Sequence, residues 1–167
     1  MFVGLISDTH GVFDREFRDF LAPVDQVWHA GDFGGGTRTE EEIASFKPLL
    51  GVYGNCDGQD IRFDCPEYRF FTCEGMTVLM MHIGGYPGRY DRRAKELIEK
   101  YRPQLFVCGH SHILKVMYDK KYEMMTVNPG ACGIQGWHAV RTALRFHIDG
   151  GQLHDMEVMN LPRKTSL

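Results

Sequence analysis

The chain has 167 residues, of which 43% are hydrophobic and 25% are charged, with a formal net charge of -3. This length and apolar content predict a single globular domain over residues 1–167, because a chain of this size can bury a continuous core. The slightly acidic balance argues against bulk binding to nucleic acid, and no apolar run approaches the roughly 20 residues that a membrane-spanning helix needs.

The first half of the chain alternates predicted strands and helices. Short apolar runs predict strands at residues 2–7, 26–29 and 49–53, with helices at about 14–22 and 39–47 between them. Pro23 and Pro48 end the two helices. Thr39 is the expected N-cap of the second helix, in front of three glutamates that suit a helix N-terminus.

The second half is richer in strands. Three hairpins are expected, at 68–73 with 76–82, at 114–118 with 122–127, and at 143–148 with 153–159. Residues 91–101 predict a helix with Asp91 as its N-cap, and residues 105–108 predict a buried strand. Only the tail after Asn160 looks loose. Alternating strands and helices followed by hairpins predict an α/β domain with mixed sheets.

The number and spacing of the cysteines indicate the redox state of the cellular compartment. None of the five forms a Cys-x-x-Cys pair, and their odd number favours a reducing compartment over a disulfide framework. The apolar start of the chain lacks a basic region and leads directly into a polar motif, so it predicts a first strand and not a signal peptide. We therefore expect a soluble, cytoplasmic protein with no membrane partner.

Five polar signatures each follow a short apolar run, at intervals of 22 to 28 residues. One strand plus a return crossover takes on the order of 30 residues, so every signature should fall at the same end of a sheet. Ligands of open α/β sheets bind at that edge. The signatures are Asp8-Thr9-His10, Gly31-Asp32, Gly54-Asn55-Cys56-Asp57, His82-Ile83-Gly84 and Gly109-His110-Ser111-His112.

The polar side chains of these signatures are of the kinds that bind divalent metal ions. Imidazole, carboxylate and amide ligands without an obvious thiolate suit Mn, Fe, Zn or Co. Two such ions carry more charge than two aspartates neutralise, and the remaining positive charge would attract a phosphate. The seven ligand candidates are Asp8, His10, Asp32, Asn55, His82, His110 and His112.

Taken in order, the five signatures resemble those of the calcineurin-like metallophosphoesterases. With the turn Asn128-Pro129-Gly130 and the small size of the chain, the sequence is most similar to the YfcE-type phosphodiesterases, from residue 2 to about 150. The resemblance implies a four-layer α-β-β-α sandwich with two mixed sheets. It also implies a dinuclear metal-dependent phosphodiesterase that acts on a small phosphoester, with Mn²⁺ as the favoured ion and Fe, Zn, Ni, Co or Mg as alternatives.

The resemblance implies a role for each ligand candidate. Asp8, His10 and His112 would bind one metal, and Asn55, His82 and His110 the other, while Asp32 would bridge both. A hydroxide shared by the two ions would attack phosphorus in line. Asn55 would also orient a phosphate oxygen.

Cys56 marks a departure from the wider superfamily. Many members have a histidine there, which is thought to protonate the leaving group, whereas a thiol with a pKa of about 8.5 lends a proton only weakly. We therefore assign no general acid and expect a preference for acidic leaving groups, such as aryl alcohols.

Further residues are candidates for supporting roles. The glycine-rich segment 84–90 follows His82 and could line the cleft, where Arg89 could pair with a phosphate oxygen and Tyr86 could stack on a ring. A plain connecting loop is the alternative interpretation. His29 and Asp57 could support the ligands, whereas the remaining histidines, His138, His147 and His154, are expected to be structural or exposed.

Two other functions are compatible with the same pattern. One is a phosphomonoesterase or nucleotidase with the same metals, which Cys56 disfavours because poor leaving groups benefit from an acid. The other is a non-catalytic protein-binding scaffold, like the eukaryotic retromer subunit of this fold with its altered metal site. The presence of all seven ligand candidates favours an enzyme. The C-terminal hairpin offers an apolar interface, so a homo-oligomer is left open.

Overall fold

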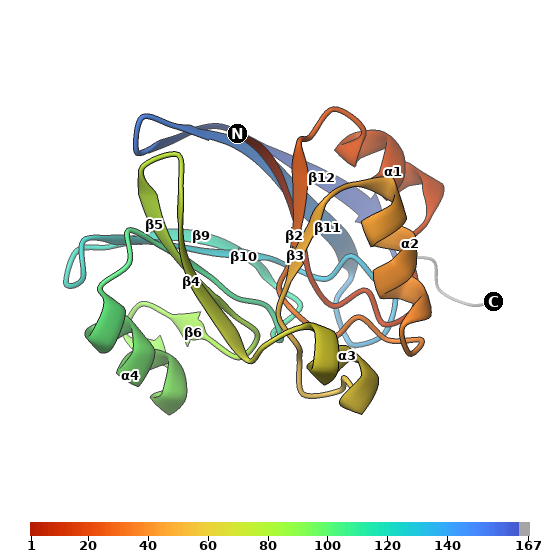
Figure 1. The fold of residues 1–167 in the computed structure, drawn as a ribbon, viewed down its shortest axis with the longest axis horizontal. Helices are drawn as coiled ribbons and strands as arrows, with labels where there is room; N and C mark the ends of the chain where they lie inside the picture. The colour runs from red at the N-terminus through yellow and green to blue at the C-terminus, as the bar shows by residue number, and fades with distance from the viewer. Residues whose placement is uncertain (164–167) are drawn as a thin grey trace.

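The computed structural model describes residues 1–163, and two five-stranded sheets face each other in it (Figure 1). The first sheet has the order β12-β11-β1-β2-β3 and the second the order β4-β5-β8-β10-β9. The first sheet contains β1 (Phe2–Ile6), β2 (Gln26–His29), β3 (Leu49–Gly51), β11 (Val140–Asp149) and β12 (Gln152–Pro162). The second contains β4 (Tyr68–Cys73), β5 (Met76–Met81), β8 (Leu105–Val107), β9 (Leu114–Asp119) and β10 (Met124–Pro129).

Helices cover the outer face of each sheet (Figure 1). On the first sheet lie α1 (Arg15–Leu21), α2 (Arg38–Phe46) and α3 (Gln59–Asp64), whose buried residues share one apolar cluster. On the second lies α4 (Arg92–Tyr101), which packs into a separate cluster. Each sheet combines parallel and antiparallel pairs. The predicted four-layer α/β sandwich with two mixed sheets is therefore confirmed.

The alternation of side chains along the strands explains why four layers form. In β5, Val78 and Met80 belong to the core between the sheets, whereas Leu79 and Met81 face α4. Both sets are buried, because a strand covered on both faces is apolar at every position. Burial of both faces explains why the sequence shows continuous apolar runs where buried strands are predicted.

Several predicted boundaries need correction. Thr39 is not an N-cap: α2 begins at Arg38, and Thr39 lies buried in its first turn. The preceding glycines Gly34 to Gly36 all have positive φ and turn the chain directly into the helix. The strand predicted at 49–53 ends at Gly51, and the hairpin strand expected from Tyr122 starts at Met124.

Other elements were missed because they are too short to show a period. They are α3, with six residues, and the two-residue strands β6 (Gly85–Tyr86) and β7 (Arg89–Tyr90). The loose tail expected after Asn160 is wrong for its first residues, since β12 continues to Pro162 through pairing with Val140. The rest of that tail, residues 164–167, lies outside the described residues, and the single domain over 1–167 stays a prediction.

Within residues 1–163, no helix is both long enough and apolar enough to cross a membrane. The parallel pairs β1/β2/β3 and β5/β8/β10 fix the position of the loops that matter for function. Because parallel strands end at the same edge, the loops after β1, β2 and β3 gather at one end of the first sheet, and those after β5 and β8 gather at one end of the second.

Candidate metal centre

All seven ligand candidates lie in the loops that follow these five strands, and the structure brings them together. Asp8 and His10 follow β1, Asp32 follows β2 and Asn55 follows β3, so four come from the first sheet. The second sheet supplies the other three, His82 after β5 and His110 and His112 after β8. The cluster therefore spans the gap between the two sheets.

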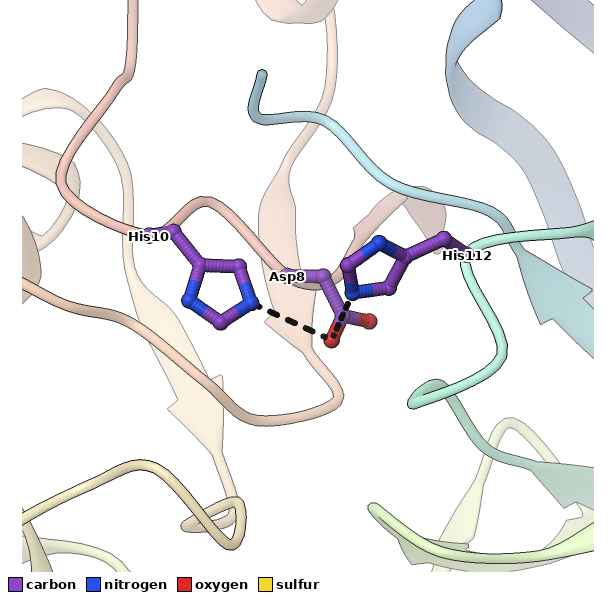
Figure 2. A group of neighbouring side chains, drawn as sticks. All are labelled: Asp8, His10 and His112. Carbon is purple, nitrogen blue, oxygen red and sulfur yellow. Dashed lines mark ion pairs between the residues drawn. The ribbon is translucent and has the colours of Figure 1, made fainter. Parts of the chain in front are cut away.

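One group of side chains is centred on the Asp8 carboxylate. Its Oδ1 atom lies 3.2 Å from Nε2 of His112 and 3.8 Å from Nε2 of His10. Figure 2 shows the two imidazoles converging on this carboxylate from separate loops. The ligand atoms of all three residues lie within 4.8 Å of one another, close enough to share one ion.

A second group is centred on Asp32. Its Oδ2 atom lies 3.1 Å from Nε2 of His82, and these two residues form a second possible metal-binding group with His110. Oδ1 of Asn55 lies 3.0 Å from Nδ1 of His110, so the amide reaches the same group. Because Oδ2 of Asp32 is also 3.6 Å from Nε2 of His10, Asp32 stands between the two groups.

The backbone at these ligands is unusual. Five of the seven candidates have left-handed φ angles, which cost about 1–3 kcal/mol each in a residue other than glycine and persist only where the surroundings impose them. They are Asp8 (54°), His10 (43°), Asp32 (60°), His110 (71°) and His112 (62°). Such strain is concentrated where function requires a particular direction of the side chain.

Asp57 holds two of the ligand loops in place. Its buried carboxylate accepts hydrogen bonds from the backbone N–H groups of Asp32 (2.9 Å), Phe33 (2.9 Å) and Gly54 (2.8 Å). It thereby ties the loop after β2 to the loop after β3. Cys56 N–H donates to Oδ1 of Asp32 at 2.8 Å, so only Oδ2 of Asp32 is left to face the histidines.

Glycine is required at two of the predicted turns. Gly31 has a φ of 102°, and a Cβ there would stand 2.7 Å from Nδ1 of His82. A Cβ on Gly54 would collide with the carboxylate of Asp32. Glycine at these two positions therefore lets the backbone approach the ligand candidates closely.

Two buried ligand atoms have no hydrogen-bond partner among residues 1–163. They are Oδ1 of Asp8 and Nε2 of His82, which lie 3.8 Å apart. The other oxygen of Asp8 accepts from Ser7 Oγ and His110 N–H, and Nδ1–H of His82 donates to the Ala30 carbonyl at 2.7 Å. Buried polar atoms without partners are costly. A cation bound to each atom would satisfy it, so the residues fit metal ions.

The electrostatics of the cluster are consistent with the same conclusion. Burial opposes ionisation of Asp8, but the imidazoles of His10 and His112 beside its carboxylate outweigh this effect and lower the pKa of the carboxyl. The nearby carboxylate of Asp8 raises the pKa of His10. Burial opposes a charge on His82, yet its pairing with Asp32 raises its pKa. The cluster thus attracts positive charge, which a proton or a metal ion can supply.

Two further histidines support the ligands. His29 was considered for this role: it is buried, its Nδ1 accepts from Gly31 N–H, and its Nε2 lies 3.0 Å from Thr9 Oγ1. Burial lowers its pKa to about 3, so the ring stays neutral. His138 was expected to be structural or exposed, but its Nδ1 lies 3.2 Å from Nδ1 of His112. No sequence signal marks this pair, whose members are 26 positions apart.

Three cavities open on the cluster, with volumes of about 310, 260 and 320 Å³. The first contains Tyr86 and Arg89 beside His110, so both residues considered as substrate contacts lie near the cluster. The second is lined by Asn55 and the third by Trp137, which is fully exposed and which sequence reasoning did not single out.

Cys56 lies close to the ligand candidates. Its Sγ atom is within 4.8 Å of ligand atoms of His10 and Asp32, although the side chain is exposed. Partial burial and the charge of Asp32 raise the pKa of the thiol. The thiol therefore stays protonated at neutral pH, which makes it a weak proton donor.

The chain matches the calcineurin-like phosphoesterase superfamily domain over residues 1–151, and it therefore belongs to this superfamily. The Asp and His cluster is consistent with the dinuclear metal site that is typical of the superfamily. No curated protein matches the sequence.

Several solved structures share the fold. A novel archaeal phosphodiesterase has a TM-score of 0.73 at 19% identity, over 96% of this chain and 100% of the other. A predicted phosphoesterase from Streptococcus pneumoniae has a TM-score of 0.66 at 20% identity, over 97% and 89%. Vps29 from Entamoeba histolytica, crystallised with Zn²⁺, has a TM-score of 0.71 at 18% identity, over 98% and 100%. At these identities the likeness shows the fold alone.

Proposed function

We propose that this protein is a dinuclear metal-dependent phosphodiesterase. The observation that carries the proposal is the convergence of seven ligand side chains from two sheets, with the buried acceptors Asp8 Oδ1 and His82 Nε2 facing each other without a donor between them. Membership in the calcineurin-like phosphoesterase superfamily supports a phosphoester as the substrate.

The grouping of the side chains supports one assignment of ligands. Asp8, His10 and His112 would hold one ion, since their ligand atoms already lie together. Asn55, His82 and His110 would hold the other, and Asp32 would contact both from its intermediate position. Mn²⁺ is the favoured ion, with Fe, Zn, Ni, Co or Mg as alternatives.

The bound ions would supply Lewis acidity, which activates water and offsets the charge on the phosphoryl oxygens. Side chains of the protein would perform the other steps. The amide of Asn55 is placed to orient a phosphate oxygen at the edge of the cluster. Cys56, with its raised pKa, gives little help to the leaving group, so aryl esters should react faster than alkyl esters.

Two alternatives make different predictions. A phosphomonoesterase or nucleotidase would use the same metals but would cleave monoesters faster than diesters. A protein-binding scaffold would bind metal without hydrolysing a phosphoester. Vps29, a protein named for vacuolar sorting, was crystallised with Zn²⁺, so zinc binding alone would not identify an enzyme.

The test compares bis(4-nitrophenyl) phosphate with 4-nitrophenyl phosphate, using protein stripped of metal and refilled with Mn²⁺, Ni²⁺, Mg²⁺ or Zn²⁺. We expect metal-dependent cleavage of the diester, lost in Asp32→Ala and His110→Ala and retained in His154→Ala, which removes an exposed histidine paired with Asp149. Faster cleavage of the monoester would favour the phosphomonoesterase. No turnover with any metal, despite two bound ions, would favour the scaffold.

A further inference from the structure

The 310 Å³ cavity beside His110 is lined by two cationic side chains, Arg89 and Lys115. Tyr86 and Arg89 are paired across the two-stranded sheet β6–β7, so both side chains point to the same face. Lys115, from β9, enters the same cavity and places its ammonium 3.7 Å from the centroid of the Tyr86 ring. This cation–π contact holds the ammonium against the ring of Tyr86, the strand partner of Arg89, in the same cavity.

Neither cation is neutralised by an acidic partner. Among residues 1–163, no ion pair involves Arg89 or Lys115, whereas Arg92 and Arg93 do form such pairs. Asp91 also lines the cavity, but its carboxylate accepts from Arg93 N–H at the start of α4. The cavity therefore keeps an excess of positive charge.

Ser111, which follows His110, provides a neutral donor in the same cavity. Its Oγ accepts hydrogen bonds from Asn128 Nδ2 at 3.1 Å and from Ile113 N–H at 3.3 Å. Since both bonds use the lone pairs of the oxygen, the hydroxyl proton is left to donate into the cavity. The hydroxyl of Ser111 thus adds a neutral donor to the two cations of the cavity.

We propose that this cavity, the anion subsite formed by Tyr86, Arg89, Ser111 and Lys115, binds a second phosphate group of the substrate. The preferred phosphodiester would then carry a phosphate monoester on one of its two ester arms. A phosphate monoester fits because it is dianionic and a guanidinium binds two of its oxygens at once. The inference rests on the proposed function, since it places the scissile phosphate at the candidate metal centre.

The test uses three diesters that share a 4-nitrophenyl leaving group and differ in the other arm. The arms are thymidine 3′-phosphate, thymidine and choline, which are anionic, neutral and cationic. We expect kcat/KM for the anionic arm to exceed that for the neutral arm by about tenfold, the effect of one charge-assisted hydrogen bond. The choline ester should be the poorest substrate.

The variants Arg89→Gln and Lys115→Gln should each bring the ratio of anionic to neutral substrate close to one. Arg92→Gln is the matched control: it removes the same charge from a side chain that is 95% exposed, pairs with Glu96 and does not line the cavity. The control should keep the preference. A wild-type ratio near one, or an equal loss in Arg92→Gln, would overturn the anion subsite.

A binding measurement separates this inference from the proposed function. Calorimetry on the metal-loaded protein compares thymidine 3′,5′-bisphosphate with thymidine 5′-phosphate, and needs no turnover. The bisphosphate could bind more tightly than the monophosphate, and lose this advantage in Arg89→Gln, even if no diester is cleaved. That result would support the anion subsite and reject the phosphodiesterase activity. Equal binding of the two nucleotides would overturn the subsite whether or not diesters are cleaved.

Discussion

His138 determines which nitrogen of His112 faces the candidate metal centre. A backbone carbonyl can only accept, so Nε2 of His138 donates to Gly133 O at 2.9 Å, and its Nδ1 is left to accept from Nδ1–H of His112. Burial lowers the pKa of His138, which keeps this ring neutral. The free lone pair of His112 is thereby held on Nε2, toward Asp8.

Replacing His138 should therefore weaken metal binding without removing a ligand. We expect His138→Phe to lower the affinity for one of the two ions by about 10- to 100-fold, the usual effect of losing the partner of a metal-binding imidazole. Calorimetric titration with Mn²⁺ would measure it. His147→Phe removes a histidine that stacks on Phe2, and it should bind both ions normally. Unchanged affinities in His138→Phe would contradict the positioning role.

Protons should compete with the metal at the same ligands. Because the pKa values of His10 and His82 are raised, both rings hold a proton at higher pH than free histidine does. An incoming ion must displace these protons, so apparent affinity should fall as pH drops below the raised pKa values and level off above them. Titrations at pH 6.5 and 8 in buffers of different protonation enthalpy would count the protons released. Affinity independent of pH would be inconsistent with this competition.

The carboxylate of Asp57 makes much of the connection between the loops after β2 and β3. Replacing Asp57 with alanine leaves three buried N–H groups without their acceptor, and we expect a loss of about 3 kcal/mol in the free energy of unfolding. Urea denaturation of the metal-free protein would measure this loss. Asp60→Ala, three positions along the chain at an exposed site, should cost much less. Similar losses in both variants would argue against a special role for Asp57.

Long or strongly patterned elements could be predicted from the sequence, and so could the side chains that meet at the candidate metal centre. The buried strands were visible as apolar runs, and the ligand candidates were visible because each one follows such a run. The pair His138 and His112 was not predictable, since it depends on how the loop before β11 returns to the site. The left-handed φ angles of Asp8 and His10 also could not be predicted from the residue types, because surrounding contacts impose these angles.

At the scale of the whole molecule, the ligand cluster joins the two sheets. Asp8 and Asp32 come from the first sheet, whereas His82 and His110 come from the second, so each bound ion would contact both. Ligand binding to the folded state alone stabilises it by about 2.7 kcal/mol at 100 times Kd. For a chain of this size, that corresponds to a rise in Tm of about 5–10 °C.

Thermal unfolding followed by circular dichroism, with Mn²⁺ and then with a chelator, would measure this shift. Asp32→Ala should lose most of it, because Asp32 lies between the two groups of ligands. His154→Ala, which changes an exposed histidine, should retain it. A Tm that does not respond to metal in the unmodified protein would mean that the sheets are not joined in this way.

The pairing of β1 with β11 has a consequence for how the protein is made. Leu5 lies opposite Leu144, and the amino group of Met1 donates to Ile148 O. The pairing of β1 is therefore complete only after β11, one of the last strands, has been synthesised. During translation, Asp8 and His10 emerge long before the segment that secures their strand. We therefore expect the centre to assemble late in biosynthesis, so that a metal ion would enter the finished protein.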